Sequence, residues 1–196
     1  VCPGCDGTGY RYDESVEQLT APVVREAMDG TDATFHGAGR EDVDALMLGT
    51  GRPLVIEVDE PRRRDVDTEE LEADINDFAD GKVEVEGLRL ATHRMVERVK
   101  EHPASNTYRL EVTFDVPVDR ASFEGALRDL DGATISQETP KRVDHRRASK
   151  TRTREVYAID GDLDAGGHGA TLEVHGEGGL YVKELVHGDE GRTEPS

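Results

Sequence analysis

The chain has 196 residues, of which 43 are acidic and 24 are basic, so its formal net charge at pH 7 is −19. This charge excludes a generic basic nucleic-acid-binding protein. No apolar run reaches the roughly 18 residues that a membrane-spanning helix needs, and no basic segment followed by an apolar one opens the chain. We therefore expect a cytoplasmic protein with a buried hydrophobic core.

The basic residues are unequally divided, because 19 are Arg and only five are Lys. A surface rich in carboxylates stays hydrated in a salt-rich cytoplasm, where salt screens the repulsion between like charges. The composition therefore favours a halophilic source. The chain begins at Val1 rather than Met, and its last residues carry no evident terminating pattern. Both features indicate a part of a longer protein.

Two cysteines near the N-terminus have the spacing of half a zinc site. Cys2 and Cys5 form a CxxC motif that is followed by glycines, which let the backbone turn tightly around two thiolates. Tetrahedral zinc needs four ligands, so the others would lie upstream or be histidines. A structural zinc is the preferred interpretation. A redox motif is the weaker one, because no βαβ pattern accompanies the cysteines.

The first half of the chain predicts short helices around one strand. Apolar residues at helical spacing over 13–28 predict two helices, because Pro22 interrupts the run. Residues 35–44 predict a glycine-bearing turn, and the apolar run 54–58 predicts a buried strand. A helix is predicted from about Thr68, with Asp67 as its N-cap. Its expected buried stripe is Leu71, Ile75 and Phe78.

The second half predicts more strands. A short helix containing Val96 and Val99 is followed by strict alternation over 108–116, which predicts a half-buried strand. Asp119 is the expected N-cap of the next helix, whose inward residues are Phe123, Leu127 and Leu130. Further strands are predicted over 155–159 and 170–175. Helices and strands without a regular βαβ repeat indicate an α+β fold around a largely antiparallel sheet.

A basic strip over 141–154 stands out from the acidic chain. It holds seven basic residues and one acid, so its formal charge is +6. Arginine suits bidentate contacts to phosphate, and the strip is therefore predicted to bind a nucleic acid on one face. The alternative is a solvated charge run. The expected contact residues of the strip are Lys141, Arg142, His145, Arg146, Arg147, Lys150, Arg152 and Arg154.

A glycine-rich turn carries the strongest candidate for a reactive carboxylate. Asp42 follows Arg40 in this turn, where the backbone can hold a carboxylate at the edge of a cleft. One alternative is a metal site made by His36, Asp42 and Asp44, as in a metal-dependent hydrolase. Another is a solvated loop. Near the other end of the chain, a glycine turn leads into a predicted helix start that presents Lys183.

Together these segments resemble the pseudouridine synthases. The order of motifs is an R-x-D turn at 40–42, a strand with T-Y-R at 107–109, and a G-x-Y-[IV]-[KR]-x-L segment at 179–185. The sequences G-T-G-R-P at 49–53 and T-P-K-R-V-D-H-R-R at 139–147 belong to the same resemblance. It is closest to the archaeal and eukaryotic enzymes that modify uridines 54 and 55 in the T-loop of tRNA.

The resemblance implies an isomerase that requires no cofactor for catalysis. Asp42 matches the catalytic aspartate, Tyr108 the tyrosine that packs on the target base, and Lys183 the basic residue that pairs with the aspartate. A neighbouring cation stabilises an ionised carboxylate, and a planar side chain offsets the cost of unstacking a base. Asp44 stays an alternative carboxylate. Leu46 and Leu54 stand where relatives often carry Arg and Phe.

The resemblance also implies the domain organisation. Residues 31–196 would form a catalytic domain of the pseudouridine synthase fold, a mixed, largely antiparallel sheet flanked by helices with a central active-site cleft, and this domain would be truncated at its C-terminal end. Residues 1–30 would be the end of a zinc-bearing, RNA-binding region that holds the metal through Cys2 and Cys5. The expected partner is tRNA, with Arg40 and the basic strip as contacts, and neither a membrane nor a nucleotide cofactor. The alternative function is a non-catalytic zinc-containing RNA-binding module.

Overall fold

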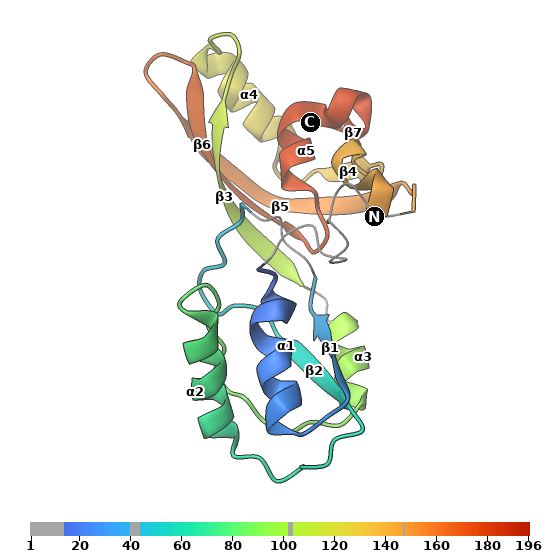
Figure 1. The fold of residues 1–196 in the computed structure, drawn as a ribbon. Coiled ribbons are helices and arrows are strands. Elements are labelled where there is room, and N and C mark those ends of the chain that lie inside the picture. Colours follow the sequence, from blue (N-terminus) through green and yellow to red (C-terminus); the bar gives the residue numbers. More distant parts are fainter. Residues whose placement is uncertain (1–13, 40–43, 102–103, 147) are drawn as a thin grey trace, which may run out of the picture. The chain divides into compact units, whose positions relative to one another are not determined.

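The computed structural model describes residues 14–39, 44–101, 104–146 and 148–196, of which 145 and 146 are described by their backbone alone. The chain divides into two compact units, Val1–His102 and Pro103–Ser196. Figure 1 labels their helices and strands and colours them along the sequence. Among the described residues, no helix has the length and apolar character needed to cross a membrane.

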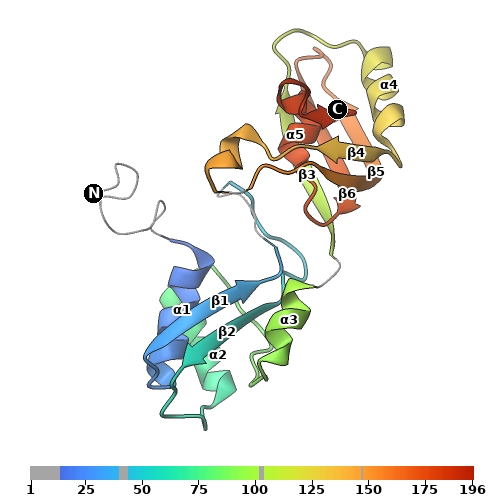
Figure 2. The same cartoon turned by 90° about the vertical axis from the view of Figure 1, so that its right-hand side faces the viewer.

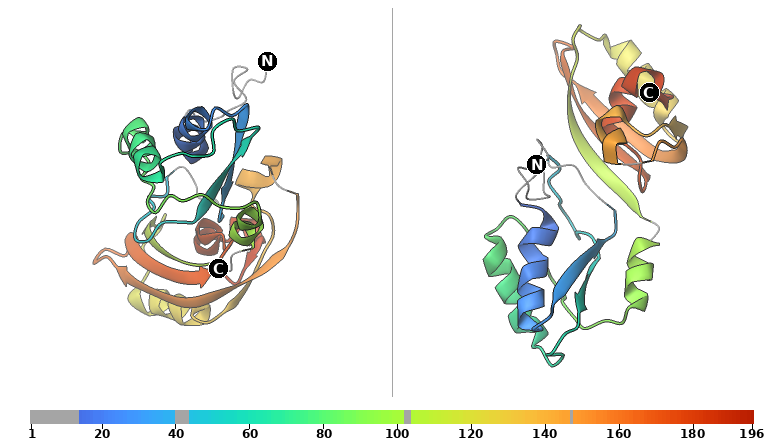
Figure 3. Two further views of the ribbon diagram at one scale, coloured as in Figure 1. Left: turned by 90° about the horizontal axis from the view of Figure 1, so that it is seen from below. Right: turned by 45° about the vertical axis from the view of Figure 1, so that its right-hand side comes forward.

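The first unit is a small sheet between helices. Strands β1 (Asp32–Gly37) and β2 (Leu54–Asp59) pair antiparallel. Helices α1 (Val16–Ala27) and α2 (Thr68–Ala79) lie on one side of this pair and α3 (Arg94–Lys100) on the other (Figures 2 and 3). The core of the unit is formed by apolar side chains that α1, α2 and the segment after α2 contribute, namely Val24, Leu71, Ile75 and Val85.

Helix α1 continues through Pro22, so the prediction of two short helices is wrong. A proline inside a helix removes one backbone hydrogen bond and costs about 3 kcal/mol. The helix start offsets part of this cost, because Ser15 and Gln18 form a capping box with bonds of 3.2 and 2.9 Å. Burial of Val24 beyond the proline also favours continuation.

Helix α2 begins where the sequence predicts, but its buried face differs. Asp67 accepts hydrogen bonds from the backbone N–H groups of Glu69 and Glu70. Phe78 is 55% exposed, so its assignment to the buried stripe is wrong. The buried position is Ala79, because burial follows the four-residue spacing from Leu71 through Ile75.

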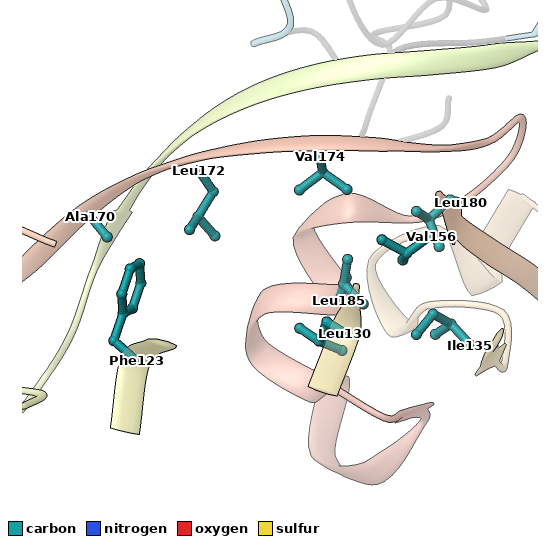
Figure 4. Packing of buried hydrophobic residues seen from close by; sticks show 9 residues of the cluster. All are labelled: Phe123, Leu130, Ile135, Val156, Ala170, Leu172, Val174, Leu180 and Leu185. Carbon is teal, nitrogen blue, oxygen red and sulfur yellow. The ribbon is translucent and has the colours of Figure 1, made fainter. Parts of the chain in front are cut away.

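The second unit is a five-stranded antiparallel sheet in the order β3-β6-β5-β4-β7. The strands are β3 (Ser105–Thr113), β4 (Thr134–Gln137), β5 (Arg152–Leu163), β6 (Gly169–Glu177) and β7 (Thr193–Glu194). Helices α4 (Arg120–Leu130) and α5 (Val182–His187) contribute to one core cluster with β4, β5 and β6 (Figure 4). The expectation of an α+β fold with antiparallel sheets is confirmed.

Most strand and cap predictions for this unit agree with the structure. The alternation over 108–116 corresponds to β3, although the strand ends at Thr113 and Val116 is 69% exposed. Asp119 caps α4 through the N–H of Ser122 at 3.0 Å. The short strands β4 and β7 have no signal in the sequence, and the basic strip contains a 3₁₀ helix, η1 (Lys141–Arg146).

The core cluster of the second unit generates a stability prediction. Ile135 on β4 is fully buried among residues of the strands and both helices (Figure 4). Ile135→Ala leaves a cavity and is expected to lower the free energy of unfolding by about 2 to 5 kcal/mol. The exposed control Val116→Ala should change it by less than about 0.5 kcal/mol. Urea denaturation followed by circular dichroism tests this, and equal effects of the two variants would contradict the assignment.

Candidate functional site

Lys183 lies in the first turn of α5, as the sequence predicts for this helix start. The preceding turn contains Gly179, whose φ of +87° favours glycine. The N–H of Gly178 donates to the carbonyl of Ala104 at 2.6 Å, which ties this turn to the chain just before β3. Lys183 is half-buried.

Tyr108 and α5 belong to the same face of the sheet. Tyr108 on β3 lies opposite Val174 on β6, and directly opposed residues of an antiparallel pair project from one face. Val174 is fully buried in the cluster that also contains Leu180 and Leu185 (Figure 4). The fold therefore places the helix of Lys183 on the sheet face that carries Tyr108, although the two residues are 75 positions apart in the sequence.

The residue before α5 is held by a side-chain amide. Gln137, at the end of β4, is buried, and its Nε2 donates to the carbonyl of Tyr181 at 3.0 Å. Its Oε1 accepts from the N–H of Tyr181 at 2.9 Å. The amide thus satisfies both backbone groups of Tyr181, as a neighbouring strand would.

A bidentate ion pair connects the basic strip to α5. Arg142 donates through Nε and Nη2 to the two carboxylate oxygens of Glu184, at 2.6 and 3.1 Å. The Glu184 side chain is 2% exposed, whereas that of Arg142 is 34% exposed. The guanidinium carbon of Arg142 also lies 6.0 Å from the ring centroid of Tyr181.

Acidic residues compensate much of the charge of the basic strip. Lys141 pairs with Glu190, and Arg154 pairs with Glu177 at 3.4 Å, in addition to the pair between Arg142 and Glu184. Arg152 donates to the Oγ1 of Thr139 at 3.1 Å. Arg147 and the side chains of His145 and Arg146 lie outside the described residues. Several cations of the strip therefore contact residues of their own unit, and the strip is not a row of equally exposed charges.

Thr139 closes the loop that carries the strip. Its buried hydroxyl group lies 2.9 and 3.2 Å from the carbonyl oxygens of Ala148 and Lys150, and 3.1 Å from the N–H of Lys150. No described carboxylate pairs with the Lys150 ammonium group, and the residue is exposed. Arg152 also has no described carboxylate partner, but it is half-buried and donates to Thr139 Oγ1 and the carbonyl of Lys150. Among the described cations of the strip, the exposed Lys150 is thus the one best placed to meet a phosphate.

Arg40, Asp42, Cys2 and Cys5 lie outside the described residues, but the base of the Asp42 loop is described. The N–H of Ala38 donates to the carbonyl of Pro53 at 3.1 Å, and Arg52 Nη1 donates to the carbonyl of Ala38 at 2.8 Å. Gly39 has a φ of +86°, and a Cβ there would lie 2.3 Å from Arg52 Nη1. The G-T-G-R-P segment thus supplies the arginine that closes this loop.

His36, two residues before Ala38 at the same loop base, forms a hydrogen bond with the carboxylate of Glu57. His36 Nε2 and His93 Nδ1 each lie 3.0 Å from an oxygen of Glu57. The hydrogen bond with His36, with a smaller contribution from His93, lowers the pKa of Glu57 from its ordinary value of 4.5, although partial burial acts in the opposite direction. In the described ranges, no three His, Cys, Asp or Glu side chains gather as a metal site.

A family model described as Pus10, C-terminal, matches residues 4–196. The chain belongs to this family. It is 68% identical to the tRNA pseudouridine synthase Pus10 of Halorubrum lacusprofundi over 195 residues, which are 100% of this chain and 45% of that protein. The synthases of Methanothrix thermoacetophila and Archaeoglobus fulgidus, also named Pus10, are each 47% identical, again over 100% of this chain, and they are covered to 43% and 54%.

The chain thus spans about half the length of the curated relatives it matches. The resemblance to archaeal pseudouridine synthases, which the motifs indicate, is confirmed by the family match. A solved chain from the crystal structure of a Cbf5-Nop10-Gar1 complex is also similar, with a TM-score of 0.48 and 18% identity. That likeness covers 86% of this chain and 38% of the other.

The loop base generates a prediction about Gly39. Gly39→Ala places a Cβ against Arg52 and strains a positive φ, so the bond between Ala38 and Pro53 should open more often. The matched control is Gly51→Ala, because Gly51 also has a positive φ but no atom near its Cβ position. Amide exchange of Ala38 should accelerate about tenfold or more in the first variant only. Equal exchange in both variants would contradict the role of Arg52.

The hydrogen bonds to Glu57 generate a prediction about pH. Because the folded-state pKa of Glu57 is lowered, its stabilising contribution is present above about pH 4.5 and is lost as the pH falls through the folded-state pKa. The wild-type chain should therefore unfold at a higher temperature than Glu57→Gln at about pH 5.5. This difference should shrink as the pH falls below about 4.5, because the folded-state pKa lies below that value. A constant difference in thermal unfolding midpoint over that range would argue against it.

Proposed function

We propose that this chain is the catalytic part of a tRNA pseudouridine synthase, an isomerase that acts on uridine 54, uridine 55 or both in the T-loop of tRNA. The observation that carries the proposal is the family match over residues 4–196. The printed names of the similar proteins support it, because they are tRNA pseudouridine synthases. Asp42, Tyr108 and Lys183 occupy the motif positions that the resemblance assigns to catalysis.

The proposed reaction rearranges one nucleotide. The bond between C1′ and N1 of the uridine breaks, the base turns, and a bond between C1′ and C5 forms. C5 loses its proton and N1 takes one up, so there is no net oxidation or reduction. Asp42 supplies the carboxylate, either as the nucleophile or as the group that initiates glycal formation.

Tyr108 and Lys183 would support this carboxylate in different ways. The target base must leave its stack to reach the site, and the ring of Tyr108 offers a surface on which it can pack. Lys183 would supply a positive charge that stabilises the ionised carboxylate. The sheet face that carries Tyr108 is also the face against which α5 packs, and this supports a shared role of the two residues in unit Pro103–Ser196.

The remaining contacts are proposed for tRNA binding and for zinc. Arg40 and the basic strip over 141–154 would meet phosphates, and Lys150 is an exposed cation of the strip for which no described carboxylate partner is found. Cys2 and Cys5 would hold a structural zinc in residues 1–30, ahead of a catalytic domain over 31–196. Their thiolates and spacing suit that metal.

The experiment that tests the proposal removes the carboxylate. Asp42→Asn keeps the shape of the side chain but removes its charge, so it should abolish pseudouridine formation while tRNA affinity changes less than about twofold. Asp44→Asn is the matched comparison two residues away and should retain product. Both variants are compared with wild type in the full-length protein, on an unmodified tRNA transcript in high KCl.

Each outcome of this experiment has a distinct meaning. Loss of product in Asp44→Asn alone would transfer the catalytic role to Asp44. No product from the wild-type protein, with tRNA binding intact, would overturn the proposed activity in favour of a non-catalytic RNA-binding module. The position of the product in the T-loop identifies the modified uridine.

A further inference from the structure

Helix α5 contains a buried charge that the proposed chemistry does not use. Glu184 follows Lys183 directly, and only 2% of its side chain is exposed. A buried carboxylate is strongly unfavourable unless it is paired and hydrogen-bonded. Its partner is Arg142, a residue of the basic strip that is 42 positions earlier in the sequence. The state of Arg142 therefore affects the helix that carries Lys183.

The geometry of Arg142 is that of an internal anchor. Two nitrogens of its guanidinium group donate to the two oxygens of Glu184, and the group also lies near the ring of Tyr181. It thus contacts residues on both sides of Lys183. An arginine fork that binds a phosphate in the same way would have to release Glu184, which would leave a buried carboxylate without its partner.

A second anchor reaches the same turn from β4. Gln137 binds both backbone groups of Tyr181, and its side chain is buried. Leu185, the fourth residue of α5, is buried in the core cluster. The first turn of α5 is therefore fixed by the core below it and by Gln137 and Arg142 at its start.

We propose that Arg142 is a positioning residue for Lys183 and not a phosphate contact of the tRNA. The pair between Arg142 and Glu184 holds the first turn of α5 so that the Lys183 ammonium group keeps its place in the active site. This inference rests on the proposed function. It also separates the basic strip into an inward anchor, Arg142, and an outward cation, Lys150.

The test compares variants of the two partners in the full-length protein. Arg142→Gln removes the fork, Glu184→Gln removes the carboxylate charge, and Arg142→Lys keeps a positive charge near Glu184. For each variant we measure the single-turnover rate constant of pseudouridine formation at saturating protein, the Kd for unmodified tRNA, and the slope of log Kd against log salt concentration. Circular dichroism and thermal unfolding establish that each variant is folded.

A positioning role predicts that rate and affinity separate. Arg142→Gln and Glu184→Gln should both lower the rate constant by about ten- to a hundredfold, because a small displacement of a catalytic group has effects of that order. Their Kd should change less than about twofold, with an unchanged salt slope. Arg142→Lys should restore part of the rate. The exposed control Arg120→Gln, which loses only a pair with Glu124, should change neither quantity.

A phosphate contact predicts the opposite pattern. Arg142→Gln would then weaken tRNA binding and reduce the salt slope by about one, as is expected for Lys150→Gln. Glu184→Gln would release Arg142 and tighten binding without loss of rate, since a carboxylate does not bind phosphate. Either result overturns the positioning role while the wild-type protein stays active. A wild-type protein that forms no pseudouridine overturns the proposed function, and the positioning role with it.

Discussion

The carboxylate of Glu184 on α5 is buried, and a buried carboxylate is unfavourable unless a positive charge pairs with it. The position of α5 therefore depends on a cation from elsewhere in the unit. Arg142 supplies that charge from a 3₁₀ helix that the sequence places far away. The pair joins the basic strip to the helix that carries Lys183. One electrostatic requirement therefore connects two segments that the motifs present separately.

Side-chain amides perform the same structural task in both units. In the second unit Gln137 binds both backbone groups of Tyr181, and in the first unit Asn76 on α2 binds both backbone groups of Val85 at 2.8 and 2.9 Å. Each amide satisfies a segment that no strand accompanies. Val85 is thus held beside α2 although residues 83–90 belong to no helix or strand.

An element can be predicted from the sequence when the interactions that form it lie between residues close together in the chain. The N-caps Asp67 and Asp119 act on amides two or three residues away, and the alternation of β3 is visible in nine consecutive residues. The course of α1 through Pro22 depends on packing that the proline itself does not reveal. Strands β4 and β7 have four and two residues, which is too short for a periodic signal, and they exist because each pairs with a distant strand.

The sequence by itself determined the family and the candidate residues, because motif order and spacing are properties of the linear chain. It also predicted the α+β class, since hydrophobic periodicity is local. Only the tertiary structure decided which cations of the basic strip form ion pairs with carboxylates and which are exposed to solvent. The pairs of Lys141, Arg142 and Arg154 are made with residues 23 to 49 positions away, and a charge run does not reveal partners at such separations because folding alone brings them together.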